Sequence, residues 1–170
     1  MMLAGIVSKG GRMRKREDIS MDNLVKRLEL LEDERAILQT LYRYGHCIDY
    51  GLEQEWVGLF TEDSVYEIRL RQSGSVIRKE GSQALAQFVA EHTRAPARYH
   101  KHLLVEPLIT LESESQATVQ SYFLRVDEGE GKLYILAFGR YKDRLVKHNG
   151  RWFFKERVCE VEALSRESAI

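Results

Sequence analysis

Four long segments rich in Val, Ile, Leu and aromatic residues occupy the second half of the chain, and they constrain the fold more than any other feature. They are YHKHLLVEPLITL, QATVQSYFLRV, KLYILAFGRYKDRLV and RWFFKERVCEVE. The polar separators ESES, DEGEG and KHNG are turn signals, and Asn149-Gly150 is typical of a two-residue hairpin. The pattern therefore predicts four successive antiparallel strands over residues 99–161.

The first half of the chain has a helical period. Apolar residues follow a helical spacing over residues 24–31, and a second apolar stripe runs over residues 37–48. The change of phase between the stripes predicts either two helices or one helix that bends near Asp33. Gly51 then provides a C-terminal stop.

Shorter elements lie between these two parts. EQEWVGLF predicts a short second helix, SVYEIRL and GSVIRKE predict the first strands, and SQALAQFVAEH predicts a third helix with Ser82 as its N-cap. Helices followed by a long antiparallel meander indicate an α+β fold in which the helices cover one face of the sheet. Pro107 interrupts its strand, which predicts an edge position or a bulge there.

The composition is that of a soluble single-domain protein. The 170 residues carry 26 basic and 26 acidic side chains, so neither a nucleic acid nor an anionic membrane is expected as a partner. Cys47 and Cys159 lack the spacing of a disulfide framework, and no apolar run reaches the roughly 20 residues of a membrane span. We expect a cytoplasmic protein with a flexible tail at residues 1–20, one domain at 21–163 and a short tail at 164–170.

Asp49 lies at the end of the predicted helix, on its apolar side. Spacings of four, three and four residues line up Leu38, Tyr42, Gly45 and Asp49. The carboxylate therefore points inward, where it needs a hydrogen-bonding partner, and Gly45 leaves open volume beside it. A structural aspartate paired with an arginine and a functional carboxylate both fit this position.

Two histidines are candidate partners for this carboxylate. His100 and His102 alternate onto one face of the first long strand, from which a histidine could reach a carboxylate on the covering helix. Together with Asp49 and His46 they also permit a metal site. The chain lacks the paired helical or cysteine spacings typical of such sites, so we expect no metal and no cofactor.

Five segments, taken in order, resemble one known family. They are L-x-R-Y-x-x-x-I-D, LFTEDSVYE, HLLVEPLI, ATVQSYF, and G-R-Y-x-D-x-L followed by G-R-W-F-F-x-E-R. In this order and spacing they are similar to the SnoaL-like branch of the nuclear-transport-factor-2-like superfamily over residues 33–160. The resemblance implies a cystatin-like, cone-shaped α+β barrel. In such a barrel, N-terminal helices pack on a curved antiparallel sheet with a mixed edge and enclose one deep apolar pocket.

The resemblance also implies an activity. Enzymes of the branch include scytalone dehydratase, bile-acid dehydratase, polyketide cyclases and ketosteroid isomerase. Their helix-end aspartate falls on Asp49, the tyrosine of the bile-acid enzyme falls on Tyr44, and their strand histidine falls on His102. Where those dehydratases carry a histidine or aspartate on the next strand, this chain has Arg125, so the catalytic set is not reproduced in full.

The chemistry that follows from these residues is enolate formation. Asp49 would fix the tautomer of His102 and raise its basicity, so that His102 removes a proton next to a carbonyl. Tyr44 or Tyr66 would donate to the enolate oxygen. Arg125 would anchor a substrate carboxylate, stabilise the enolate or pair with Asp49. Dehydration, isomerisation and aldol cyclisation share this step, so all three stay open.

The pocket implied by the resemblance would be lined by Trp56, Tyr66, Leu104 and Phe123 and would hold an apolar, carbonyl-containing small molecule. Two non-enzymatic roles stay open. One is the structural beta subunit of a ring-hydroxylating dioxygenase, which several segments also resemble, and the other is a ligand-binding domain. The long strands have apolar residues on both faces, which predicts a homodimer, or a trimer, that buries the outer face of the sheet.

Overall fold

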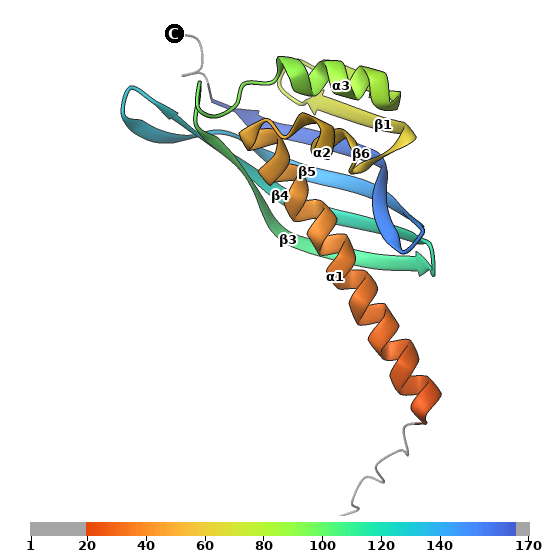
Figure 1. The fold of residues 1–170 in the computed structure, drawn as a ribbon. Helices are drawn as coiled ribbons and strands as arrows, with labels where there is room; N and C mark the ends of the chain where they lie inside the picture. The colour runs from red at the N-terminus through yellow and green to blue at the C-terminus, as the bar shows by residue number, and fades with distance from the viewer. Residues whose placement is uncertain (1–19, 166–170) are drawn as a thin grey trace, which may run out of the picture.

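The computed structural model describes residues 20–165 (Figure 1). The helices are α1 (Met21–Tyr50), α2 (Glu53–Val57) and α3 (Gly81–Glu91). The strands are β1 (Phe60–Leu70), β2 (Val76–Glu80), β3 (His100–Ser113), β4 (Gln116–Gly129), β5 (Lys132–His148) and β6 (Arg151–Leu164). Apart from residues 20, 164 and 165, the predicted tails lie outside the described residues.

The strands form one sheet in the order β2-β1-β6-β5-β4-β3. The four strands from β3 to β6 pair in antiparallel hairpins, which confirms the predicted meander, whereas β1 pairs with β6 in parallel. The sheet does not close into a barrel, because β2 and β3 lie at its opposite edges (Figure 1). The predicted α+β class is therefore confirmed, with an open mixed sheet under the helices.

The β5–β6 hairpin turns at Asn149-Gly150, as predicted. Both residues have positive φ, 50° and 75°, and His148 pairs with Arg151 across them. This is the geometry of a two-residue turn whose twist matches that of the flanking strands. Because Asn and Gly tolerate left-handed φ better than other residues, this dipeptide sets the register of β5 against β6 beside the turn, as far as the shift between Leu145 and Arg144.

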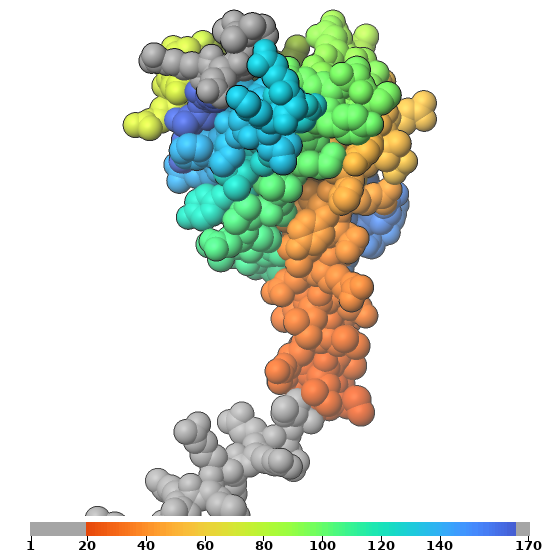
Figure 2. All heavy atoms as spheres, turned by 90° about the vertical axis from the view of Figure 1, so that its left-hand side faces the viewer, coloured from red at the N-terminus to blue at the C-terminus, as the bar shows by residue number. Residues whose placement is uncertain are grey.

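α1 is one continuous helix, so the alternative of two separate helices was wrong, and a bend near Asp33 stays a prediction. Its N-terminal half extends past the sheet, with Leu24, Leu28 and Leu31 exposed (Figures 1 and 2). Burial begins at Ile37. The change in apolar phase thus marks where the helix meets the sheet. Gly51 ends the helix with φ 71° and donates its N–H to a carbonyl of the last turn.

α3 begins differently from the prediction. Glu80 holds the N-cap position in place of Ser82, and no side chain caps the helix. Gly81 has φ 76°, so the chain turns from β2 into α3 within one residue. The Ser82 prediction was wrong because a left-handed glycine, and not a serine side chain, begins this helix.

β3 is an edge strand with a bulge at Pro107, and both features were predicted. Its register with β4 shifts between Val105 and Leu108, and Glu106 has φ 49°. Proline has no N–H to donate to a neighbouring strand, which suits both features. His100 and His102 precede the bulge and therefore share one face of β3.

The core lies between the helices and the face of the sheet that they cover, and it is rich in aromatic rings. The ring of Trp56 has its centroid 5.5 Å from that of Tyr44 and 4.8 Å from that of Phe60. Arg157 is a charged exception among the largest fully buried side chains. Within residues 20–165, no helix is long and apolar enough to cross a membrane.

Candidate active site

Asp49 and His102 form the hydrogen-bonded pair that the sequence predicted. Asp49 lies in the last turn of α1, and its Oδ1 is 2.6 Å from Nδ1 of His102. The backbone N–H of His102 donates to Oδ2 of Asp49 over 3.1 Å. Only 4% of the Asp49 side chain and 11% of the His102 side chain are exposed. These contacts hold the carboxylate and the imidazole ring in one orientation.

The Asp49 carboxylate is ionised at neutral pH. Burial alone would raise its pKa, but the hydrogen bonds and the charge of His102 together lower the pKa below its usual value. An ionised Asp49 accepts the Nδ1 proton of His102, which leaves Nε2 as an acceptor. Nε2 is therefore the nitrogen of the ring that Asp49 does not engage.

Gly45 allows α1 to approach β3 this closely. A Cβ atom at Gly45 would lie 2.9 Å from the backbone carbonyl oxygen of His102. Gly45 precedes Asp49 by one helical turn, so the helix meets the strand beside the hydrogen-bonded pair. The volume that the sequence indicated beside Asp49 is thus filled by the backbone of β3.

A cavity of about 310 Å³ lies between the end of α1 and the first half of β3. Its walls contain four of the predicted site residues, namely Tyr44, Asp49, His102 and Leu104. Tyr141 of β5 and Arg157 of β6 also line it, so the cavity reaches the covered face of the sheet. Its volume is at the lower end of the range for small-molecule sites.

Three residues predicted to line the pocket lie in the packed core. Trp56, Tyr66 and Phe123 are at most 3% exposed and do not line this cavity. Aromatic rings fill the deep interior that the resemblance would leave open. Tyr66 is linked to the cavity only through its hydroxyl, which lies 2.9 Å from that of Tyr44. Contact of these three residues with a substrate stays a prediction.

Arg125 pairs with a carboxylate that was not considered from the sequence. It lies opposite His102 on β4. Its Nε and Nη2 donate to the two oxygens of Asp127 over 2.8 and 3.1 Å. Asp127 is fully buried. The guanidinium of Arg125 is thus paired with Asp127, whereas Asp49 is hydrogen-bonded to His102. A direct role of Arg125 in catalysis stays a prediction.

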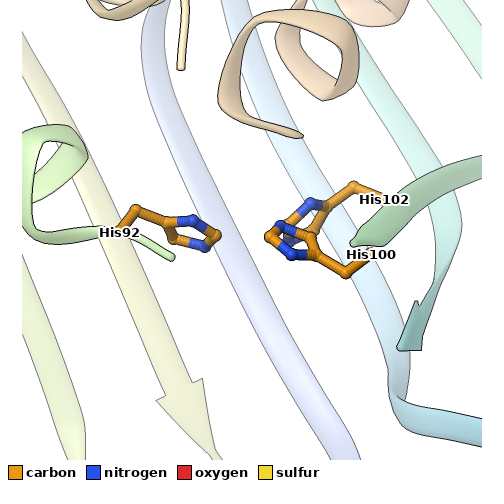
Figure 3. A group of neighbouring side chains, drawn as sticks. All are labelled: His92, His100 and His102. Atoms are coloured by element: carbon orange, nitrogen blue, oxygen red, sulfur yellow. The ribbon is translucent and has the colours of Figure 1, made fainter. Parts of the chain in front are cut away.

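Three histidines, His92, His100 and His102, lie close together (Figure 3). Two of them, His100 and His102, lie next to Asp49. His92 comes from the segment after α3, whereas His100 and His102 project from β3. Burial is the main cause that lowers the pKa of His92 and of His100 to about 4, so both rings are neutral at pH 7. The sequence placed His92 at the end of the predicted third helix, with no role in the site; in the structure α3 ends at Glu91, and His92 is its C-cap.

Arg157 is a second functional candidate. It is the last residue of the family-like segment G-R-W-F-F-x-E-R, but no role in the site was predicted for it from the sequence. Its side chain is fully buried, and its guanidinium carbon lies 3.9 Å from the ring centroids of both Tyr44 and Tyr141. Its Nε is 3.2 Å from Oδ1 of Asp143. None of its nitrogens has a hydrogen-bond partner in the part of the chain that the structure describes. Burial raises the pKa of Asp143 to about 7 despite the opposing effect of Arg157, so Arg157 is only partly neutralised near pH 7.

A bulge in β6 explains why Arg157 was missed. Trp152 and Phe154 are buried in alternation, which would place Glu156 inward next. The register of β6 against β5 shifts at this point, where Phe154 and Glu156 pair with consecutive residues of β5. The extra residue, Lys155, reverses the alternation and turns Arg157 inward. A bulge of this kind has no Gly or Pro signal in the sequence.

Comparison with known proteins identifies similar domains. The SnoaL-like domain family matches residues 29–158. No curated protein sequence matches the chain. Among solved structures, a nuclear-transport-factor-2-like protein with a cystatin-like fold from Novosphingobium aromaticivorans is 23% identical, with a TM-score of 0.76 over 89% of this chain and 96% of that chain.

Two further structures from the same organism are similar. A candidate scytalone dehydratase is 25% identical, with a TM-score of 0.65 over 81% of this chain and 89% of that chain. The beta subunit of a candidate aromatic-ring-hydroxylating dioxygenase is 22% identical, with a TM-score of 0.68 over 77% of this chain and 90% of that chain. These likenesses confirm the cystatin-like fold that the resemblance implied.

Proposed function

The chain belongs to the SnoaL-like domain family, and on this premise we propose that it catalyses acid/base chemistry on an apolar, carbonyl-containing small molecule. The substrate is held in the cavity between α1 and β3. The observation that carries the proposal is the 2.6 Å hydrogen bond between Asp49 and His102 in the wall of that cavity. A buried carboxylate behind a histidine ring is a general-base arrangement. The similarity to a candidate scytalone dehydratase supports the same class of reaction.

The first step is removal of a proton. Nε2 of His102 takes a proton from the carbon next to the substrate carbonyl, and the C–H electron pair delocalises into an enolate. Asp49 stabilises the imidazolium that forms. The proton then leaves with a β-hydroxyl group as water, returns at another carbon, or passes to the oxygen of a second carbonyl that the enolate attacks. These outcomes are dehydration, isomerisation and cyclisation.

Arg157 is the group that we assign to the enolate oxygen. The oxygen carries negative charge. Arg157 lines the cavity, and its buried N–H groups have no hydrogen-bond partner among the described residues, although Nε is ion-paired with Asp143 over 3.2 Å. Burial raises the pKa of Tyr44 to about 12, so its hydroxyl keeps its proton. That hydroxyl is already hydrogen-bonded to the hydroxyl of Tyr66, however. We therefore assign Tyr44 as a secondary donor to the enolate oxygen, after Arg157.

Proton exchange tests the proposal without the natural substrate. Protein treated with EDTA is incubated in D₂O with cyclic ketones that carry a β-hydroxyl group or a β,γ-double bond, and deuterium uptake is followed by proton NMR. We expect exchange next to the carbonyl that is slowed by Asp49→Asn and unchanged by His148→Ala, which alters an exposed histidine at the β5–β6 turn. Exchange no faster than in buffer across the panel would contradict the proposal.

A structural role is the second candidate, and one observation favours it. The N-terminal half of α1 exposes a set of large apolar side chains that nothing in residues 20–165 covers. They are Met21, Leu24, Val25, Leu28, Leu30 and Leu31. A beta subunit of a ring-hydroxylating dioxygenase would cover such a surface with a larger iron–sulfur subunit. Purification from the native cell with such a subunit, and without exchange activity, would favour this role.

A further inference from the structure

We propose that His92, His100 and His102 form a binding site for a divalent transition-metal ion, with zinc as the best fit. One nitrogen from each ring can be chosen so that all three lie within 4.8 Å of one another. Figure 3 shows the ring of His92 approaching from one side and the rings of His100 and His102 from the other. Only His102 belongs to the proposed base pair, so the acid/base reaction does not account for this cluster.

The spacing of the rings suits a tetrahedral ion. Zinc binds a histidine nitrogen at about 2.0–2.1 Å, which places the centroids of imidazole ligands roughly 5 Å apart and their nitrogens about 3.3 Å apart. The centroids here are 5.3, 5.6 and 5.2 Å apart. The rings therefore already have the separation of a three-histidine site. Rotation of the rings, without a change in the distances between them, would bring their nitrogens together.

Each ring has a nitrogen available for the ion. Nδ1 of His92 lies 2.6 Å from the carbonyl oxygen of Thr93, which leaves Nε2 as the ligand. Nδ1 of His102 is engaged with Asp49, which again leaves Nε2. The His100 side chain is fully buried, and neither of its nitrogens has a hydrogen-bond partner within the described chain. A buried polar group without a partner is costly, and coordination would satisfy it.

The surrounding groups also suit a cation. A ligating histidine usually donates its second N–H to a carboxylate or a carbonyl, which is what Asp49 and Thr93 accept here. Asp49 adds negative charge, with Oδ1 3.4 Å from Nε2 of His100. Arg125 is a nearby cation, and its charge helps to lower the pKa of His92 and of His100. Its partner Asp127 also lies 3.4 Å from Arg98, so Asp49 is the carboxylate that offsets positive charge at the histidines. Three histidines leave the fourth position of a tetrahedral ion to water or to a ligand oxygen.

Metal binding and proton removal compete for the same atom. The ion takes Nε2 of His102, which is the nitrogen that the proposed reaction uses as its base. A bound metal ion therefore inhibits the acid/base reaction. This consequence rests on the proposed function, whereas the metal site itself does not.

Cobalt titration tests the site without any substrate. Tag-free protein treated with EDTA is titrated with Co²⁺, which absorbs visible light strongly in tetrahedral sites, and bound zinc is measured by mass spectrometry after dialysis. We expect one ion per chain and a tetrahedral cobalt spectrum. His92→Ala should lower the affinity at least about tenfold. His92 lies outside the helices and strands. The far-UV circular dichroism of the His92→Ala variant should therefore match that of the wild type.

The matched control is His148→Ala, which removes an exposed histidine and should leave the affinity unchanged. His100→Gln removes the buried ligand and should also abolish the tetrahedral spectrum. The proposal is overturned if the wild type binds no stoichiometric metal, or if His92→Ala binds as tightly as the wild type. The comparison of His92→Ala with the wild type tests the site even if His100→Gln fails to fold. Failure of this titration leaves the exchange assay untouched, so the two proposals fail separately.

Discussion

At the scale of single residues, Asp49 and His102 should act as one unit. Asp49→Asn and His102→Ala should each lower transition-state stabilisation by about 2–5 kcal/mol, and the double variant by little more, because paired catalytic groups fail together. The measurement is kcat/KM for proton exchange with protein treated with EDTA. Additive losses, or a fully active His102→Ala, would reject the mechanism.

Asp143 should make stability depend on pH. Burial raises its pKa to about 7 in the folded protein, above the roughly 3.9 of an unfolded chain. Because the folded pKa is the higher one, the stabilisation is complete below about pH 4 and is lost as the pH rises through about 7. Between about pH 4 and pH 8 the wild type should therefore lose about 2–4 kcal/mol of unfolding free energy relative to Asp143→Asn.

Urea unfolding of both proteins across this pH range measures the difference. The difference in unfolding free energy between the wild type and Asp143→Asn cancels the contributions of the other titrating groups, because the two proteins differ in one side chain. If the wild type gains stability over the variant as the pH rises, Arg157 holds the Asp143 carboxylate ionised, and the raised pKa is wrong.

The residues of the site differ in how far the sequence could predict them. A helical period placed Asp49 inward and strand alternation placed His102 inward, because both follow from regular backbone geometry. Arg157 depends on the bulge at Lys155, which arises where β5 and β6 pair and has no local signal. His92 depends on the path of an irregular segment. Contacts between distant parts of the chain decide such positions.

At the scale of elements, the close approach of α1 to β3 shapes the site, and the Gly45→Ala variant tests whether this approach is needed. Alanine in place of glycine usually stabilises a helix by about 1 kcal/mol. Here the added Cβ would lie 2.9 Å from the His102 carbonyl oxygen. We expect Gly45→Ala to destabilise the protein by about 1–3 kcal/mol and to slow proton exchange, because Asp49 is pushed away from His102.

Urea unfolding and the exchange assay are the measurements for this variant. Gln39→Ala, on the exposed side of the same helix, is the control and should leave both quantities nearly unchanged. An equal or greater stability of Gly45→Ala would show that the helix is free to shift.

Elements with local signals were the ones that the sequence predicted well. The turn at Asn149-Gly150 and the bulge at Pro107 depend on the backbone preferences of the residues themselves. The start of α3 was missed because the φ of Gly81 outweighs a serine cap. The mixed edge of the sheet came from the resemblance alone, because nothing local joins β1 to β6. Pairing of strands distant in sequence is a property of the whole fold.

At the scale of the whole molecule, the face of the sheet away from the helices should bury against a second copy. On β4, Tyr122 and Leu124 alternate with the buried Phe123, and Leu124 pairs with Phe138 of β5. Tyr122 is 58% exposed and Phe138 is 46% exposed. Exposed apolar groups gathered on one face are typical of an interface.

We therefore expect a homodimer in solution, and Phe138→Lys should shift it toward the monomer. Light scattering at micromolar concentration measures both states. A wild-type mass of 19.8 kDa would contradict the expectation. A trimer would keep the interface prediction and change only its symmetry.

The position of β6 has a consequence for how the chain folds during synthesis. β6 is the last strand of the described chain, yet it lies between β1 and β5 in the sheet. Until residues 151–164 have left the ribosome, β1 and β2 have no place beside the meander, and the apolar face of α1 has no complete sheet to cover. Such nascent chains expose apolar surface for most of translation and attract chaperones. A substitution that slows the docking of β6 should therefore first reduce the yield of soluble protein, before any loss of activity per folded molecule.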